Sequence, residues 1–176
     1  MSTNHIRIPL VAPGTNPELA NIEARILAER GRISLLYQAL LNSLPITEGW
    51  KAMLTAVRNR TGLDAAVREM VILRVAVLNQ AEFEFDAHVP HAQNAGLTEK
   101  KIYGLREQAP QDGYTSLELL IITLTDHMTR DVVVPAALME EIKRIFGITG
   151  TVELVATVAA YNMVSRFLVA LNISHA

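Results

Sequence analysis

The sequence predicts an all-α protein with eight or nine helices. Half of the 176 residues are hydrophobic but only 5% are aromatic, a balance typical of helical rather than strand-rich proteins. No stretch alternates apolar and polar residues as a half-buried strand does, and no glycine-rich phosphate-binding loop is present. A chain of this length can bury a core without disulfides or a structural metal.

The chain is expected to begin with an arm that is not helical. Pro9, Pro13 and Gly14 interrupt any regular structure there, so residues 1–16 are expected to lie extended over the surface. Residues 17–176 show no linker and no low-complexity segment, which predicts a single helical domain.

Capping residues and helix breakers place the individual helices. Thr115 and Glu118 have the spacing of a capping box, and Pro45 is expected to end one helix so that Thr47 caps the next. Glycine favours helix C-termini, whereas proline is tolerated in a first turn. The helices expected from these signals cover residues 17–30, 35–41, 48–61, 64–79, 81–96, 98–107, 116–130, 135–146 and 148–172.

The central pair of helices differs in character from the rest. The helix over residues 64–79 is capped by Asp64, and only Arg68, Glu69 and Arg74 interrupt its apolar residues. A helix that is hydrophobic on every side is expected to be buried on every side. A tight break at Asn79-Gln80 then leads into a helix over residues 81–96 that carries acids and histidines, with Pro90 inside it.

One face of this second helix combines alanines with groups that can transfer protons. At 100° per residue its inward arc contains Ala81, Glu84, Phe85, His88, His91, Ala92 and Ala95. Glu84 and His88 are four residues apart, a spacing that allows direct contact between carboxylate and imidazole. This arrangement predicts an acid and base site.

The two acids near His88 are expected to differ in pKa. Glu69 lies among apolar residues of the preceding helix, where burial is expected to raise its pKa toward neutrality. Glu84 lies in a first helical turn, where the helix dipole favours the charged form. Two carboxyl groups in different environments beside one histidine are the layout expected for proton shuttling.

Structural explanations of the same residues are also open. Glu84 and His88 could form an ordinary surface pair, and Glu69 could form a salt bridge with Arg74 or another arginine. A metal site at Glu84, His88 and His91 is weakly supported, because the sequence places no further ligand, so no metal is expected. The polar residues away from this stretch are assigned structural roles: Asp126 and His127 at the surface, and Tyr161, Asn162 and Arg166 between helices or subunits.

Several segments together resemble the carboxymuconolactone decarboxylase and alkylhydroperoxidase D (AhpD-like) superfamily. The resemblance rests on Glu69, RVAVLN at 74–79, AEFE at 81–84, His88 and AGLT at 95–98. It implies an AhpD-like helical domain. In the peroxidase branch, Ala81 and Glu84 occupy the positions of the redox cysteines. The chain contains no cysteine, so a peroxidase mechanism with a thiolate nucleophile is excluded.

The decarboxylase branch lacks the cysteine pair and implies a different chemistry. It predicts a cofactor-independent lyase, a decarboxylase or isomerase acting on a small carboxylated or lactone substrate. Glu69, Glu84 and His88 are then the expected catalytic residues, and Ala81, Phe85 and His91 are expected to bind substrate or to support the site. The alternative is a non-catalytic member that keeps the fold and binds a small molecule or a protein.

Charge and segment composition limit the other partners. The 16 basic residues are scattered and balanced by 18 acidic ones, so nucleic acid is not an expected partner. The N-terminus lacks the pattern of a secretory signal, which predicts a cytoplasmic protein. Residues 152–171 are apolar but contain Glu153, Asn162 and Arg166, so they are expected to form a core or interface helix and not a membrane span. The apolarity of this helix and of residues 64–79 predicts a homo-oligomer, and the resemblance implies a trimer or hexamer.

Overall fold

The computed structural model describes residues 5–110 and 112–174. Helices account for all the regular structure of these residues, and no strand forms among them, so the all-α prediction is confirmed. In chain order they are η1 (Pro17–Leu19), α1 (Ala20–Arg30), α2 (Leu35–Leu40), α3 (Leu44–Asn59), α4 (Ala65–Leu78), α5 (Glu82–Asn94), α6 (Glu99–Gly104), α7 (Ser116–Asp126), the π-helical turn η2 (His127–Asp131) and α8 (Ala136–Ala170).

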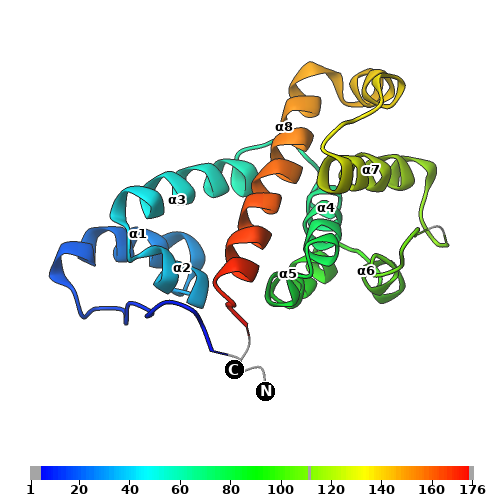
Figure 1. Cartoon of the computed structure of the whole chain (residues 1–176). Helices are drawn as coiled ribbons and strands as arrows, with labels where there is room; N and C mark the ends of the chain where they lie inside the picture. The colour runs from blue at the N-terminus through cyan, green and yellow to red at the C-terminus, as the bar shows by residue number, and fades with distance from the viewer. Residues whose placement is uncertain (1–4, 111, 175–176) are drawn as a thin grey trace.

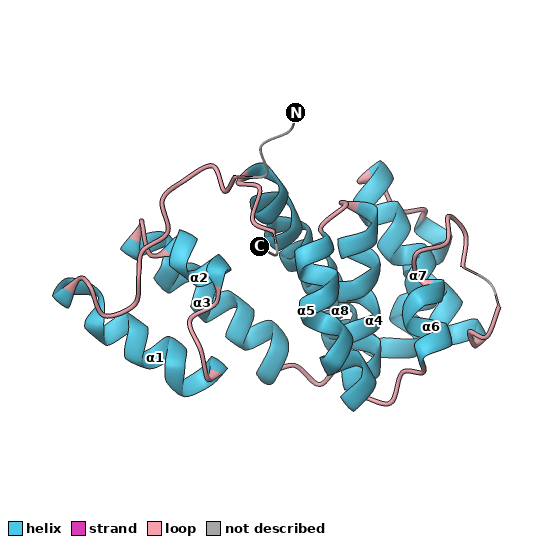
Figure 2. Ribbon diagram, turned by 90° about the horizontal axis from the view of Figure 1, so that it is seen from below, coloured by secondary structure: helices cyan, strands magenta, loops and turns pink. Residues whose placement is uncertain are grey.

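The helices form two groups on either side of the long helix α8. Figures 1 and 2 show α1, α2 and α3 together on one side and α4, α5, α6 and α7 together on the other. Helix α4 packs against α5, α7 and α8, and α3 packs against the opposite side of α8. The space between the first group and α5 and α8 is where the candidate site lies.

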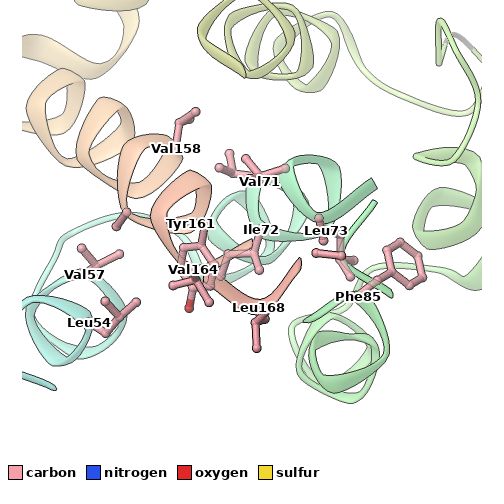
Figure 3. Packing of buried hydrophobic residues seen from close by; sticks show 14 of the residues in the cluster. Leu54, Val57, Val71, Ile72, Leu73, Phe85, Val158, Tyr161, Val164 and Leu168 are labelled. Atoms are coloured by element: carbon pink, nitrogen blue, oxygen red, sulfur yellow. The ribbon is translucent and has the colours of Figure 1, made fainter. Parts of the chain in front are cut away.

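Helix α4 is the most deeply buried element of the fold. Each residue from Met70 to Ala76 is at most 1% exposed, which confirms the expectation that this helix is buried on every side. Figure 3 shows Val71, Ile72 and Leu73 of this helix surrounded by core residues of its neighbours. Because one chain provides all of this burial, the apolarity of α4 does not by itself require a second subunit.

Arg74 is the one charged residue in this buried stretch, and it is fully paired. Its guanidinium donates to both carboxylate oxygens of Asp126 at 2.6 Å and to the carbonyl oxygens of Leu105 and Glu107 at 2.6 and 2.7 Å. Arg74 therefore does not pair with Glu69, and the arginine that does is Arg68, whose Nε lies 3.5 Å from the Glu69 carboxylate. Asp126 is not a surface residue either, because it lies partly buried as the partner of Arg74.

The start of α3 differs from the sequence-based expectation. The helix begins at Leu44, with Pro45 inside its first turn, four residues before the expected position. Thr47 is consequently not the N-cap. Its side chain is completely buried, and its hydroxyl donates to the carbonyl oxygens of Leu40 and Ser43 at 2.6 and 3.0 Å, so it joins α3 to α2.

The caps of the other helices agree with the expected ones. The Asp64 side chain accepts hydrogen bonds from the backbone N–H groups of Ala66 and Val67 at the start of α4. Thr115 and Glu118 form the capping box of α7. Residues 5–16 contain no helix, and the Arg7 N–H donates to the carbonyl of Leu171. Residues 1–4 and 175–176 of the predicted arm and domain lie outside the described residues.

Helix α8 is two helical segments joined at Gly147, as the separate helices expected over 135–146 and 148–172 indicated. Gly147 has φ 65° and ψ −177°, a backbone conformation available in practice only to glycine. By length and composition α8 could cross a membrane, yet half of its most apolar window is buried inside the fold. Leu154, Val158 and Leu168 form part of the core, which confirms the expected core role of the helix.

Replacing Gly147 with alanine is expected to lower the free energy of unfolding by about 1–3 kcal/mol, because alanine must adopt this strained conformation. No atom lies within 4 Å of the added Cβ, so the cost is conformational and not a steric clash. Gly49, which is helical and equally open, is the control, and Gly49→Ala is expected to leave stability unchanged or to raise it. Denaturant unfolding of both variants measures the difference. Equal effects of the two substitutions would contradict the strain at Gly147.

One exposed face of α8 is apolar in the single chain. Ile148 and Val152 are 72% and 62% exposed, and Met163 is 40% exposed further along the same helix. Asn162, by contrast, binds within the chain, where its side chain pairs with those of Asn79 and Thr129. The exposed face is compatible with a subunit interface, and the homo-oligomer stays a prediction.

Candidate active site

The turn between α4 and α5 brings the predicted acids and histidines together. Gln80 has a positive φ of 58°, and the N–H of Ala81 donates to the carbonyl of Ala76 at 2.8 Å. This tight reversal sends α5 back along α4, and the two helices pack closely over their lengths. Glu69 of α4 is thereby placed beside His88 of α5, as the predicted helix break at Asn79-Gln80 requires.

His88 is held by Glu69. The Nδ1 of His88 lies 2.7 Å from Oε2 of Glu69, and both side chains are almost completely buried. The Nε of Arg68 lies 3.5 Å from the other oxygen of Glu69. When Glu69 is ionised, Nδ1 of a neutral His88 donates to it, which leaves Nε2 as a proton acceptor. This pair therefore orients a histidine base.

Glu84 makes a different contact from the one expected. Its Oε2 accepts a hydrogen bond from the hydroxyl of Ser165 on α8, and the structure shows no bond between Glu84 and His88. Its other oxygen, Oε1, is buried and has no hydrogen-bond partner among the described residues. The side chain as a whole is 2% exposed. The expected direct pair of Glu84 and His88 is thus wrong, although both residues are buried at one site.

The pKa values of the two acids are the reverse of those expected. Burial raises the pKa of Glu84 to about 8, and the hydrogen bond from Ser165 only partly opposes this. Burial also acts to raise the pKa of Glu69, but the hydrogen bond and charge of His88, with the charges of Arg58 and Arg68, lower it below the usual value. Glu84 is therefore the protonated acid near neutral pH, and Glu69 is the carboxylate.

His88 is a base in its neutral form. Burial lowers the pKa of His88, and the hydrogen bond and charge of Glu69 act against this decrease. Tyr161 of α8 packs edge-on against the His88 imidazole, with 5.3 Å between the ring centroids. The ring centroids of His88 and His91 are 5.5 Å apart. A neutral histidine and a protonated glutamic acid can accept and donate a proton at one site.

A cavity of about 270 Å³ opens beside these groups. Most of its lining residues come from α1, α2 and α3 and from α5 and α8, and Figure 2 shows where these helices lie. Apolar and aromatic side chains form much of its wall, and Figure 3 shows Leu54, Tyr161, Val164 and Leu168 close together. The polar residues that line it are Glu29, Arg30, Arg32, Ser34, Arg58, Asn59, Glu84, His88 and His91.

The predicted site residues differ in where they lie relative to the cavity. Glu84, His88 and His91 line the cavity, and His91 is an exposed residue at its rim. Glu69 is not among the lining residues and reaches the cavity only through His88. Ala81 and Phe85 do not line it either. Phe85 packs under the guanidinium of Arg106, 3.9 Å from the ring centroid, so its contacts are structural.

Sequence reasoning missed the residues that α1, α3 and α8 contribute. Trp50, Leu54 and Arg58 follow each other at intervals of four on α3, so Arg58 continues an apolar stripe, which was a usable signal. Ser165 follows Tyr161 at the same spacing on α8. Tyr161 was expected to join helices or subunits, and it lines the cavity against His88 instead.

The donor set does not form a metal site. Among the described residues, no group of three or more His, Cys, Asp or Glu side chains converges as metal ligands would. Glu84 and His88 point to different partners, Ser165 and Glu69, and His127 is engaged with Asp131 elsewhere. The arrangement is suited to proton transfer at a small ligand in an apolar cavity.

The middle of the chain matches a known protein family. Residues 45–122 match the sequence model of the carboxymuconolactone decarboxylase family, a segment that contains Glu69, Glu84 and His88. The uncharacterised protein YdfG of Bacillus subtilis is 30% identical over 84 residues, which are 47% of this chain and 57% of YdfG. The chain thus spans little more than half the length of this relative.

Solved structures show the same fold at lower sequence identity. A peroxidase-related protein of Ralstonia eutropha, described as an alkylhydroperoxidase AhpD core, has a TM-score of 0.81 at 14% identity, covering 97% of this chain and 92% of its own. A peroxidase-related protein of Silicibacter has a TM-score of 0.79 at 16% identity, covering 94% and 89%. A protein of unknown function from Agrobacterium tumefaciens has a TM-score of 0.72 at 21% identity, covering 78% and 95%.

The chain thus contains a segment that matches the carboxymuconolactone decarboxylase family model, has the fold of AhpD-like proteins, and contains no cysteine. Thiol peroxidase chemistry is excluded for this chain, because it contains no cysteine.

Proposed function

We propose that the protein is a cofactor-independent lyase, a decarboxylase or isomerase, acting on a small carboxylated or lactone substrate. The observation that supports this most directly is the environment of Glu84. It is a protonated acid at the wall of a cavity, with one oxygen held by Ser165 and the other unpartnered. His88, neutral and oriented by Glu69, supplies the base beside it.

The chemistry needs only proton transfers. In decarboxylation the bond between the carboxylate and the adjacent carbon breaks, carbon dioxide leaves, and the bonding electron pair stays on that carbon. Glu84 gives its proton to this carbon, and the resulting carboxylate regains a proton from solvent. In isomerisation His88 removes a proton from carbon and Glu84 delivers one at another position. Burial raises the pKa of Glu84 to about 8, so this acid holds its proton at neutral pH, and burial lowers the pKa of His88, so this base is neutral.

The test measures turnover of lactone acids and β-keto acids by the wild type, Glu84→Gln and His88→Ala. Release of carbon dioxide and NMR of the product detect the reaction. Each substitution is expected to lower kcat by about 10²–10⁴, the usual contribution of a general acid or base. Glu82→Gln is the matched control, because Glu82 lies on the same helix, is exposed and pairs with Arg106 outside the cavity. It is expected to retain full activity.

The outcomes separate the two candidate functions. Activity that survives both substitutions in folded protein would overturn the lyase mechanism. No turnover of any such acid by the wild-type protein, together with binding of the ligand, would instead favour a non-catalytic member that binds a small molecule.

A further inference from the structure

The wall of the cavity formed by α1 and α3 carries an excess of positive charge. Arg30, Arg32 and Arg58 all line the cavity. The acid on the same wall, Glu29, is neutralised by an ion pair with Lys51 and accepts a hydrogen bond from Thr55 at 2.6 Å. Arg58 makes no ion pair with the described residues, and Glu84 on the opposite wall is protonated near neutral pH. Among the groups that line the cavity, an entering anion therefore meets more positive than negative charge.

Unsatisfied polar atoms gather at the same cavity. Five buried side-chain nitrogen or oxygen atoms of the described residues have no hydrogen-bond partner, and three of them belong to cavity-lining residues. These three are Nε of Arg30, Nε1 of Trp50 and Oε1 of Glu84. Buried polar groups are normally paired, so atoms left over around one cavity indicate where a ligand binds. Two of the three are N–H donors on the α1 and α3 wall, and Trp50 is only 7% exposed.

The charge of Arg58 acts across the cavity. After burial itself, this charge is the next largest cause that lowers the pKa of His91, and it also acts to lower the pKa of Tyr161 against the effect of burial. His91 is on α5 and Tyr161 on α8, and both line the cavity together with Arg58 of α3. A bound anion would lie within the field of this guanidinium.

We infer that Arg30, Arg58 and Trp50 form an anion-binding wall that holds a carboxylate of a small ligand, with the ligand body directed toward Glu84 and His88. As a substrate subsite, this assignment rests on the proposed function. The guanidinium N–H groups and the indole N–H donate to the carboxylate oxygens. The ligand is small, because about 270 Å³ is below the range of roughly 300–1,000 Å³ typical of pockets for drug-sized molecules. Leu54, Tyr161 and other lining residues favour an apolar or aromatic body.

Trp50 provides a direct measurement of binding, because it is the only tryptophan in the sequence and it lines the cavity. Titration of the full chain at pH 6 with phenylacetate, and separately with its uncharged amide phenylacetamide, is followed by tryptophan fluorescence. Phenylacetate is expected to change the emission with a Kd in the millimolar range or below, and phenylacetamide to bind about tenfold more weakly, because it lacks the charge.

Arg58→Met is expected to weaken phenylacetate binding by about tenfold or more, the effect of losing one charge-assisted contact, and to leave phenylacetamide binding unchanged. Arg60→Met is the matched control: it removes the same charge from the end of the same helix, but Arg60 is exposed and does not line the cavity. Circular dichroism and thermal unfolding verify that both variants are folded. Arg30→Met provides a second test of the same wall on α1.

Three results would overturn the inference: no response of wild-type Trp50 to phenylacetate, equal binding of acid and amide, or equal loss in Arg58→Met and Arg60→Met. Failure of the proposed function would look different. Glu84→Gln is expected to bind phenylacetate normally, since it retains the α1 and α3 wall. If Arg58→Met loses the ligand while Glu84→Gln and His88→Ala leave turnover unchanged, the anion-binding wall stands and the lyase mechanism falls.

Discussion

Replacing Arg74 with methionine is expected to lower the free energy of unfolding by about 3–5 kcal/mol, the usual cost of breaking a buried ion pair. Arg74 is completely buried in α4 and satisfies the carboxylate of Asp126 as well as the carbonyl oxygens of Leu105 and Glu107. The substitution leaves these acceptors without their donor in the interior. Denaturant unfolding at neutral pH, with the slope checked for two-state behaviour, measures the loss.

Arg130 offers the matched control for this prediction. It lies 3.5 Å from Asp126 and donates to the carbonyl of Gln108 at 3.3 Å, so it shares two partners with Arg74, but its side chain is 44% exposed. Arg130→Met is expected to cost less than about 1 kcal/mol, because exposed pairs are weak. Comparable losses in the two variants would show that burial does not determine the strength of the Arg74 cluster.

Replacing Glu84 with glutamine is expected to make stability less dependent on pH. The pKa of Glu84 is raised from 4.5 to about 8 in the folded protein, so the unfolded chain releases this proton at lower pH than the folded chain does. The contribution of Glu84 to stability is complete below about pH 4.5 and is lost as the pH rises to about 8. For a single group with this shift, the loss between pH 5 and pH 8 is on the order of 3 kcal/mol.

Glutamine does not ionise, so it does not incur this loss. The free energy of unfolding of Glu84→Gln minus that of the wild type is therefore expected to increase by about this amount, on the order of 3 kcal/mol, between pH 5 and pH 8. Urea unfolding of both proteins at several pH values gives the difference. Glu82→Gln, on the exposed side of α5, is the control, with no comparable increase expected over this range. Parallel curves for Glu84→Gln and the wild type would show that Glu84 is ionised at pH 7.

The expected pH dependence of stability would bear on function as well. A carboxyl group that keeps its proton at pH 7 at a cost in stability is what a general acid requires. The pH dependence of kcat is then expected to show activity falling as the pH rises through about 8, because Glu84 ionises there.

Local signals predicted most of the helices. Asp64 and the capping box of Thr115 and Glu118 act through atoms a few residues away, so their effect can be read from the chain. Pro45 was misjudged, because proline both ends helices and fits first turns, and the choice depended on the buried contact of Thr47 with Leu40. At Gly147 the sequence indicated a break between two helices, but the backbone conformation of this glycine came only from the structure.

The structure brings the predicted acid and base residues together, but their electrostatics differ from those expected. Glu69, Glu84 and His88 were identified from their spacing and from the family resemblance, and the structure buries all three. Their pairing and pKa values were wrong, because helix position suggested a charged Glu84 whereas the tertiary fold buries it against Ser165 of α8. Desolvation of a fully buried carboxyl group exceeds the effect of a helix terminus.

By itself the sequence determined the helices, the absence of thiol chemistry and the placement of an acid and base group on neighbouring helices. These features depend on residue type and on spacings within a few turns. Only the tertiary structure decided which acid keeps its proton, which partner holds His88, and that Arg30, Trp50 and Arg58 meet that site across a cavity. Those outcomes depend on burial and on distances between side chains far apart in the chain, which no local pattern records.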